Sequence, residues 1–312
     1  MNNPFPYSLD NKRYHTWNYY LKTHYGTKVC KVPLNAGFTC PNRDGSKSTG
    51  GCTFCSSLGS GEFQGASKAS LMEQFEHGAQ IMHRKWPDAQ LMAYFQSYTN
   101  TYGPLEKIKE CVEPFLERED VIGICIATRS DCLPSEVIDY LNKCADIKDI
   151  WIELGLQTIH DCTSERINRA HTYEQFKEKV LELTNTKLKI CVHLMNSLPY
   201  ETEEMMLQTA KEVGKLPIHA LKIHMLHLIK GTKMHQQYQE EPFDLLTQEQ
   251  YVQLVVKQLR LIPPHIIIQR LTGDGMKDSL AAPLWTLNKT QVTNDIDKLM
   301  AKLNVMQGDL YE

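Results

Sequence analysis

The chain has 312 residues, 42% of them hydrophobic and 23% charged, which is typical of a folded globular protein and argues against a large disordered part. Its formal net charge of −3 predicts no general attraction to nucleic acid, although a local basic surface remains compatible with it. Because no apolar run approaches the roughly 20 residues of a membrane-spanning helix and the N-terminus has no basic-then-apolar signal sequence, we expect a cytoplasmic protein with no membrane partner.

The chain alternates short apolar, β-branched runs with longer amphipathic stretches, which predict strands and helices respectively. Strands are expected at 27–34, 89–96, 121–128, 149–156, 188–195, 219–226 and 265–272. Helices are expected near 67–85, 104–117, 134–145, 172–184, 201–214, 247–261 and 289–303. Strands that are largely apolar and are each followed by a helix predict parallel pairing, with both faces of the sheet covered.

This α/β pattern fits either a doubly wound sheet or a (β/α) barrel. No GxGxxG motif follows a strand, which removes the main positive sign of a dinucleotide-binding fold. Polar residues gather where the strands end, as expected for a barrel with its site at the C-terminal face. We therefore predict a partial or full (β/α) barrel of the TIM type at 27–272. A short N-terminal arm (1–26) precedes it, and a C-terminal extension (273–312) packs on it.

The cysteines fall into two groups. Disulfides are rare in the cytoplasm, so ten cysteines need another explanation. Seven are scattered without metal-ligand spacing, several of them in apolar runs, and are expected to be buried small hydrophobic residues. These are Cys30, Cys111, Cys125, Cys132, Cys144, Cys162 and Cys191.

The other three, Cys40, Cys52 and Cys55, lie in a glycine- and serine-rich loop at 35–63, after the first expected strand. A structural zinc site is closed by four protein ligands, and no fourth ligand lies nearby in the sequence. Three thiolates on an iron–sulfur cluster instead leave one iron open to a small molecule. Phe54, between the last two cysteines, is apolar where a zinc knuckle accepts almost any residue. We predict a [4Fe–4S] cluster, with a zinc site or plain thiols as the alternatives.

The sequence resembles the radical S-adenosylmethionine (SAM) superfamily, and within it the YtqA/YhcC group of MnmL-type tRNA modification enzymes, relatives of the elongator catalytic subunit. The resemblance rests on "RYHTWNYYLKTHYG", "FTCPNRDG", "GGCTFCSSLGSGEF", "AYFQSYTNTYGP", "ATRSDCLP", "IELGLQTIHDCTSERINRAHT", "KIHMLHLIKGT" and "QRLTGDG". It covers nearly the whole chain, although the gap between Cys40 and Cys52 is longer than in the common CxxxCxxC pattern. It implies a cluster whose open iron binds SAM, and cleavage of SAM to a 5′-deoxyadenosyl radical.

The resemblance also places residues at the strand ends beside SAM. Gln96, Tyr98 and Asn100 follow the second expected strand, where many relatives carry a glycine-rich segment that contacts the amino group of SAM. A hydrogen-bond network that stabilises the loop is the alternative. Arg129 and Asp131 end the third strand, and the Arg129 guanidinium suits bidentate binding of a carboxylate from SAM or substrate.

Glu153 and Gln157 end the fourth expected strand, which the resemblance places beside SAM. A buried, paired carboxylate is the structural alternative for Glu153. On the fifth strand, His193 either faces the barrel lumen or is a hydrogen-bonded core residue. Ser197 and Tyr200 stand where the related pattern usually has glycine, and this makes the adenosine contact expected there less certain.

Basic and acidic side chains on the last two strands are the remaining candidates for substrate binding or catalysis. Lys222 and His224 are two residues apart and share one face of a strand, close to His227. Pointing inward, they would meet a phosphate, a carboxylate or a nucleobase; pointing outward, they would form an ordinary polar face. Arg270 and Asp274 form a second polar cluster, and the resemblance favours function at both places.

The resemblance implies a tRNA substrate, with conversion of 5-carboxymethylaminomethyl to 5-aminomethyl at the wobble uridine. The lost carboxylate would be held by Arg129, Lys222 or Arg270. A reduced flavodoxin- or ferredoxin-like electron donor and a downstream methyltransferase are the other expected partners. A small-metabolite substrate and a zinc-stabilised RNA-binding protein are the alternatives. Five cations near the cysteine loop are expected at the surface, as a basic patch or as ordinary solvated side chains: Lys12, Arg13, Lys22, Lys28 and Lys31.

Overall fold

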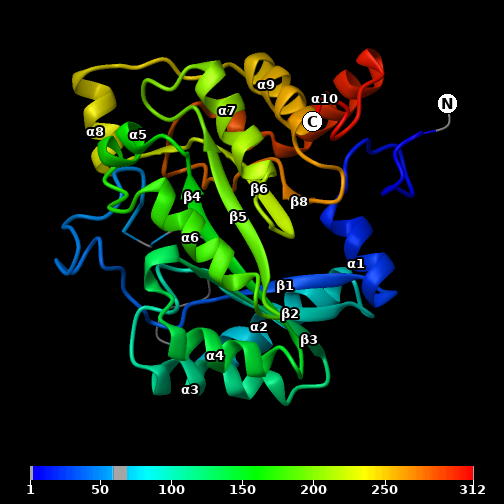
Figure 1. The fold of residues 1–312 in the computed structure, drawn as a ribbon, viewed down its shortest axis with the longest axis vertical. Coiled ribbons are helices and arrows are strands. Elements are labelled where there is room, and N and C mark those ends of the chain that lie inside the picture. Colours follow the sequence, from blue (N-terminus) through cyan, green and yellow to red (C-terminus); the bar gives the residue numbers. More distant parts are fainter. Residues whose placement is uncertain (1–2, 58, 60–68, 312) are drawn as a thin grey trace.

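A computed structural model describes residues 3–57, 59 and 69–311, and its centre is a sheet of seven strands (Figure 1). Residues 58 and 60–63 of the expected cysteine loop lie outside the described residues. All neighbouring strands pair in parallel. In spatial order they are β1 (Val29–Leu34), β2 (Gln90–Phe95), β3 (Val121–Thr128), β4 (Asp149–Gln157), β5 (Lys189–Asn196), β6 (Ala220–Met225) and β8 (Ile267–Arg270).

The strand order decides between the two folds that the sequence left open. A doubly wound sheet reverses its order at a switch point, whereas here the spatial order follows the chain from β1 to β8. Right-handed crossovers in such a sheet put the helices that connect successive strands on the same side, and the sheet curls away from them (Figure 1). Within the described residues β1 and β8 remain edge strands. The predicted barrel is confirmed, in its partial form.

The helices predicted between the strands form within a few residues of their expected bounds. Several begin at capping boxes, such as the pair Ser70 and Glu73 or the pair Thr172 and Gln175, which explains their sharp starts. The C-terminal helix was also expected. These helices are α2 (Leu71–Lys85), α3 (Leu105–Leu116), α4 (Ser135–Cys144), α6 (Tyr173–Leu183), α7 (Glu203–Gly214), α9 (Gln248–Leu261) and α10 (Lys289–Leu303).

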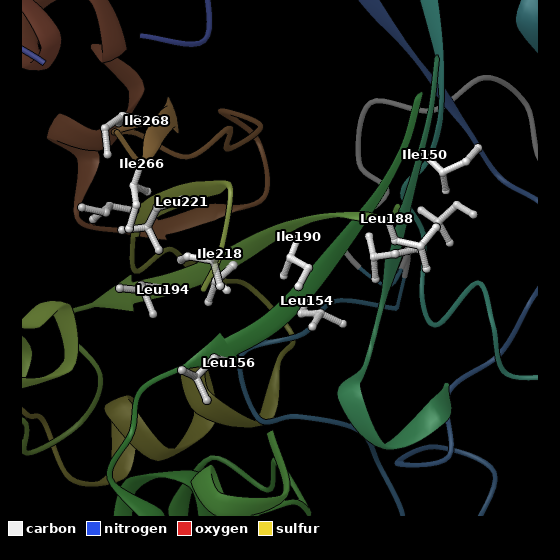
Figure 2. Packing of buried hydrophobic residues seen from close by; sticks show 14 of the residues in the cluster. Ile150, Leu154, Leu156, Leu188, Ile190, Leu194, Ile218, Leu221, Ile266 and Ile268 are labelled. Carbon is white, nitrogen blue, oxygen red and sulfur yellow. The ribbon is translucent and has the colours of Figure 1, made fainter. Parts of the chain in front are cut away.

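Strand alternation separates two kinds of interior. On β4, Ile150, Leu154 and Leu156 pack outward into the main core between sheet and helices. Figure 2 shows these residues with their neighbours on β5, β6 and β8. On the other face of β4, Glu153, Gly155 and Gln157 line a cavity in the lumen. The same strand therefore builds the core with one face and the site with the other.

A helix not expected from the sequence, α1 (Trp17–Tyr25), closes the amino-terminal end of the lumen. Its Leu21 packs in a small core with Cys125, Trp151 and Cys191 from three strands. The ring of Trp17 meets the Trp151 ring edge-on, with centroids 4.9 Å apart. Aromatic residues have modest helix propensity, so tertiary packing rather than local preference explains this helix.

The other unexpected elements surround the carboxyl ends of the strands. They are α5 (Asp161–Arg166), α8 (Lys233–Glu240), the antiparallel pair β7 (Leu228–Ile229) and β9 (Leu280–Ala282), and two 3₁₀ turns, η1 (Ser130–Cys132) and η2 (Leu284–Leu287). Near the end of the chain, Gln307 donates to the carbonyls of Pro263 and Ile266 at 2.7 and 2.8 Å. These contacts join the end of the chain to the segment that precedes β8. No described helix has the length and apolar character needed to cross a membrane.

Candidate functional site

A cavity of about 700 Å³ occupies the lumen at the carboxyl ends of the strands. This volume lies within the range of pockets that hold drug-sized ligands. Among the described residues, most of the site residues expected from the sequence border it, but Asn100, Asp131, Ser197 and Tyr200 do not, and Asp131 is paired with Arg129. The bordering ones are Cys40, Cys52, Phe54, Cys55, Gln96, Tyr98, Arg129, Glu153, Gln157, His193, Lys222, His224, His227, Arg270 and Asp274.

The described part of the cysteine loop lies at the top of this cavity and contains backbone turns. The backbone N–H of Arg43 donates to the Cys40 carbonyl at 2.8 Å, and the backbone N–H of Cys55 donates to the Cys52 carbonyl at 3.0 Å. The Asn42 Nδ2 lies 3.5 Å from the Cys52 sulfur and also donates to the Asn168 carbonyl. None of the three cysteines forms a disulfide bond, as a shared inorganic cluster would require.

The remaining cysteines follow the sequence expectation with one exception. Six of the seven scattered cysteines are buried, and Cys125 and Cys191 belong to the small core above α1. Cys162 is exposed on α5, so the expectation that it is a buried hydrophobic residue was wrong. Its place in the first turn of a surface helix explains the difference, because the inward positions of that turn are taken by Thr163 and Ser164.

A segment after α5 that sequence reasoning did not single out supports the loop from below. Asn168 and Ala170 have positive φ angles of 55° and 58°, which non-glycine residues rarely adopt. The carbonyls of Asn168 and Arg169 both accept from Asn42. The Arg169 guanidinium lies 3.8 Å from the Cys52 sulfur, and its buried Nε has no partner. In the sequence this segment is the polar run "RINRAHT", and nothing in that run alone indicates contact with the cysteine loop.

His171, in the same segment, leads to a prediction about acid stability. It is 7% exposed, and burial, helped by Arg169 and Arg129, lowers its pKa to about 3. The unfolded chain would take up this proton near pH 6.5. As the pH is lowered from about 6.5 to 3, the free energy of unfolding should therefore decrease. This residue should contribute up to about 1.4 kcal/mol per pH unit to the decrease.

We expect His171→Gln to make that slope shallower by up to this amount in the cluster-free protein. Urea unfolding followed by circular dichroism at several pH values measures it, with His77→Gln on the exposed side of α2 as the control. An unchanged slope in His171→Gln would mean that the folded protein protonates His171 as readily as the unfolded chain does.

Arg129 and Asp131 form an ion pair beneath the cysteine loop. The Arg129 Nε and one terminal nitrogen donate to the two Asp131 oxygens at 2.9 and 2.8 Å, and the other terminal nitrogen donates to the Arg169 carbonyl at 2.9 Å. Burial alone would raise the pKa of Asp131, but the bonds from Arg129 and Lys47 hold that pKa well below its usual value. The carboxylate that Arg129 binds bidentately is therefore that of Asp131, whereas the sequence predicted a carboxylate of SAM or substrate.

Arg129→Lys tests this supporting contact. A lysine cannot span both Asp131 and the Arg169 carbonyl, so at least one buried group loses its partner. We expect the free energy of unfolding to fall by about 2 kcal/mol. Arg118→Lys is a matched control, since Arg118 grips Asp120 with the same two-pronged geometry but is 24% exposed. Equal losses in the two variants would contradict a supporting role for Arg129.

Gln96, Tyr98 and Gln157 lie on the loops that follow β2 and β4. Tyr98 has a φ of 61°, and its hydroxyl donates to the Ser57 carbonyl, two residues after Cys55. Gln157 has a φ of 72°, and its Oε1 is buried without a partner. A Cβ atom added at Gly155 would come within 2.9 Å of the Gln157 side-chain amide, so the end of that side chain would have to shift. Gln96 borders the cavity nearby.

The structure explains the position of Asn100 and the replacement of glycine by Ser197 and Tyr200. Asn100 donates to the carbonyls of Phe95 and Ala127 at 3.1 and 2.9 Å, and so joins the ends of β2 and β3 in a loop-stabilising network. Ser197 and Tyr200 have φ angles of 71° and 64°, which glycine adopts without strain. The backbone keeps the shape that glycine would favour, although the side chains are larger.

The floor of the cavity holds a buried ion cluster built from four strands. The Glu153 carboxylate is fully buried and accepts from Lys31 at 2.6 Å, from His193 Nε2 at 3.1 Å and from Lys222. Burial lowers the pKa of His193 to about 4, so the imidazole is neutral at pH 7. Burial would raise the pKa of Glu153, but Lys222 and Lys31 hold it well below its usual value.

Lys31 was expected at the surface, and the structure shows that this was wrong. Its β1 position places it in the lumen, where its ammonium also donates to Gln269 of β8 at 2.8 Å. It therefore bridges the two edge strands of the partial barrel. The alternation of β1 gives Lys31 the same side as Val29 and Pro33, a pattern visible in the sequence once the strand is known to face a lumen.

The last strands contribute the rest of the predicted polar set. His224 stacks on His193 with ring centroids 5.5 Å apart, and its Nε2 is buried without a partner. At the rim, Arg270 and Lys289 share the carboxylate of Asp274, with Arg270 at 2.7 Å. Lys222 and His224 both face inward, so the outward alternative is excluded for them.

The site fits the predicted cofactors on its own chemistry. Cys40, Cys52 and Cys55, none of which forms a disulfide bond, all border a cavity large enough for a nucleoside-sized ligand. Beside them lie buried polar atoms that lack partners, including Gln157 Oε1 and Arg169 Nε. Unsatisfied buried polar atoms are rare in folded proteins and often mark the place of a ligand.

Comparison with known families decides the identity. The profile of the Radical SAM superfamily matches residues 40–213, beginning at the first cluster cysteine, and the Radical_SAM C-terminal domain matches 218–302. The chain belongs to the radical SAM superfamily. This family uses a [4Fe–4S] cluster and SAM, as predicted from the three cysteines.

Individual relatives agree with this radical SAM assignment. The chain is 47% identical to YtqA of Bacillus subtilis over 100% of its own length and 97% of that protein, and 34% identical to YhcC of Escherichia coli over 93% of each. It is 25% identical to a tRNA uridine(34) acetyltransferase of Methanocaldococcus jannaschii, over 54% of this chain and 30% of that protein.

Among solved structures, Elp3 of Methanocaldococcus infernus shares the fold, with a TM-score of 0.67 and 17% identity. The match covers 90% of this radical SAM chain and 64% of the Elp3 chain.

Proposed function

We propose that this radical SAM enzyme modifies the wobble uridine of tRNA and converts a 5-carboxymethylaminomethyl side chain into 5-aminomethyl. The observation that carries the proposal is the arrangement of the cavity. Cys40, Cys52 and Cys55 lie on one side of it, and on the other side Lys31 and Lys222 share a single carboxylate, so that positive charge is in excess. The partial match to a protein named for action on tRNA uridine(34) supports the choice of substrate.

Each side of the cavity suits one part of such a reaction. Cys40, Cys52 and Cys55 would hold the cluster. Gln157 and Arg169 carry unpartnered polar atoms suited to SAM. When bound, the cluster and SAM supply abstraction of a hydrogen atom by a 5′-deoxyadenosyl radical. The protein's own task is to bind the uridine substituent, orient its C–H bond and exclude water from the lumen.

The carboxymethyl group would leave as glyoxylate: its CH2 loses a hydrogen atom and an electron, with SAM as the net two-electron oxidant, and water hydrolyses the resulting imine to the 5-aminomethyl group. The enzyme must therefore recognise a carboxylate. The cavity wall opposite the cysteines carries Lys31, Lys222, Arg270 and Lys289 but only two carboxylates, Glu153 and Asp274, among the described residues. This cation excess favours an anionic substituent. A reduced flavodoxin- or ferredoxin-like protein as electron donor and a methyltransferase acting on the 5-aminomethyl product complete the proposal.

Nucleoside analysis of tRNA tests the proposal. In a strain that lacks this protein, we expect 5-carboxymethylaminomethyluridine to accumulate and the 5-aminomethyl derivatives to disappear, as measured by mass spectrometry of digested tRNA. The wild-type chain should restore them and Cys55→Ala should not. Cys162→Ala, at the exposed cysteine of α5, should restore them as well as the wild type does.

The purified enzyme separates the remaining outcomes. With dithionite and SAM, conversion of the isolated tRNA should accompany formation of 5′-deoxyadenosine. Formation of 5′-deoxyadenosine without any change in tRNA, in the strain or in the assay, would overturn the tRNA substrate and point to a small metabolite.

A further inference from the structure

The floor of the cavity contains more positive charge than its own groups neutralise. The ammonium groups of Lys31 and Lys222 share one carboxylate, that of Glu153. The side chains of Lys31 and Lys222 are 17% and 8% exposed, so both are largely removed from water while still bordering the cavity. Two buried ammoniums with one carboxylate leave a single surplus positive charge.

The neighbouring histidines do not cancel this charge. His193 donates toward Glu153, and His224 stacks on His193. Burial lowers the pKa of both imidazoles, so each is neutral at pH 7. Burial also lowers the pKa of Lys222. The Glu153 carboxylate opposes this shift, but the positive charge of Lys31 nearby adds to it. Lys222 is therefore the less well compensated of the two lysines.

Unused hydrogen-bonding atoms surround this surplus charge. Lys222 donates to Glu153 and lies 3.3 Å from the Tyr94 hydroxyl, which leaves one of its three N–H groups unassigned. His224 Nε2 and Gln269 Nε2 are buried without a partner. Buried polar atoms without partners are costly, and a bound ligand would relieve this cost.

The same residues do not make a good cation site. Ligand atoms of Glu153, Cys191 and His193 lie within 4.8 Å of one another, which is close enough for one metal ion. However, the carboxylate of Glu153 already binds two ammonium groups, and a metal ion would add positive charge where it is already in excess. The electrostatics favour an anion.

We propose that the cavity floor is a subsite for the carboxylate of the substrate, with Lys222 as its counter-ion and His224 and Gln269 as hydrogen-bond partners. A carboxylate carries one negative charge and so matches the single surplus charge of the floor. Arg129 has its guanidinium engaged by Asp131, and Arg270 lies at the rim beside Asp274. The proposal rests on the proposed function for the identity of the substrate, but the preference for a carboxylate can be measured without tRNA.

Binding of a matched ligand pair tests the subsite. The probes are the nucleoside 5-carboxymethylaminomethyluridine and its primary amide, which has nearly the same shape but lacks the negative charge. Calorimetric titration of the cluster-reconstituted protein should show the acid binding at least about tenfold more tightly than the amide. Lys222→Gln should abolish this preference. It should still fold, because Lys31 and Glu153 then remain as a balanced pair.

Lys189→Gln is the matched control. Lys189 is on the neighbouring strand β5, 19% exposed and paired with Asp149, but it lies at the opposite end of the sheet from the cavity. This variant should keep the full preference for the acid. A melting temperature recorded for each variant shows that the folds are comparable.

The outcomes separate this inference from the proposed function. Equal affinity of the wild type for acid and amide, no binding of either, or an undiminished preference in folded Lys222→Gln would overturn the subsite. A preference that depends on Lys222, found together with tRNA nucleosides that do not change in the deletion strain, would support the subsite and overturn the proposed tRNA substrate.

Discussion

Cys55→Ala is expected to remove the cluster and with it all SAM cleavage. The variant keeps only two of the three thiols at the top of the cavity, too few to hold a cluster that already has an open iron. We expect iron content and the brown charge-transfer absorbance to fall to background after anaerobic reconstitution. Formation of 5′-deoxyadenosine should fall by more than the roughly 10- to 100-fold that losing an outer-shell partner costs a metal site.

Cys162→Ala provides the control, since Cys162 is exposed on α5 and does not border the cavity. It should reconstitute like the wild type. Full iron and normal 5′-deoxyadenosine formation in Cys55→Ala would exclude Cys55 as a ligand. Stoichiometric zinc in the wild type, with no cleavage of SAM, would restore the zinc-stabilised RNA-binding alternative.

Glu153→Gln is expected to be strongly destabilising. The fully buried Glu153 is the carboxylate partner of Lys31 and Lys222, and an amide leaves both ammonium groups without a counter-charge. Removing one member of a buried ion cluster typically costs about 3–5 kcal/mol. We therefore expect the free energy of unfolding, measured by urea titration, to fall by about that amount.

The matched control for Glu153 is Glu76→Gln. Glu76 is also paired, with Arg118, but its side chain is 51% exposed, and exposed pairs contribute at most about 1 kcal/mol. A loss in Glu153→Gln no larger than in this control would mean that the two lysines do not depend on the carboxylate. That result would also remove the reason for counting a surplus charge on the floor.

Local patterning was enough to predict the architecture. Each of the seven parallel strands formed where an apolar, β-branched run predicted it, because such runs suit a strand covered on both faces. The spacing of Cys40, Cys52 and Cys55 was likewise enough to predict a [4Fe–4S] cluster. In both cases the residues on which the prediction depends are close together in the sequence.

The parts that escaped prediction depend on contacts between distant segments. Lys31, Glu153 and Lys222 meet only because three strands curl around one lumen, and the strand period alone does not say which face becomes the inside. Arg169 supports the cysteine loop from more than a hundred residues away in the chain. The roles proposed for Gln96, Gln157 and Arg270 in cofactor or substrate binding remain predictions for mutagenesis.

The packing of α1 against the lower end of the lumen has a kinetic consequence. Because Trp17 and Leu21 pack with Trp151 at that end, we expect the floor to be reached from the carboxyl ends of the strands, where Cys40, Cys52 and Cys55 border the cavity. Under the two proposals above, a substituent on the floor would lie deeper in the lumen than SAM at these cysteines. We therefore expect an ordered sequence, in which the substrate binds before SAM and the modified product leaves after methionine and 5′-deoxyadenosine.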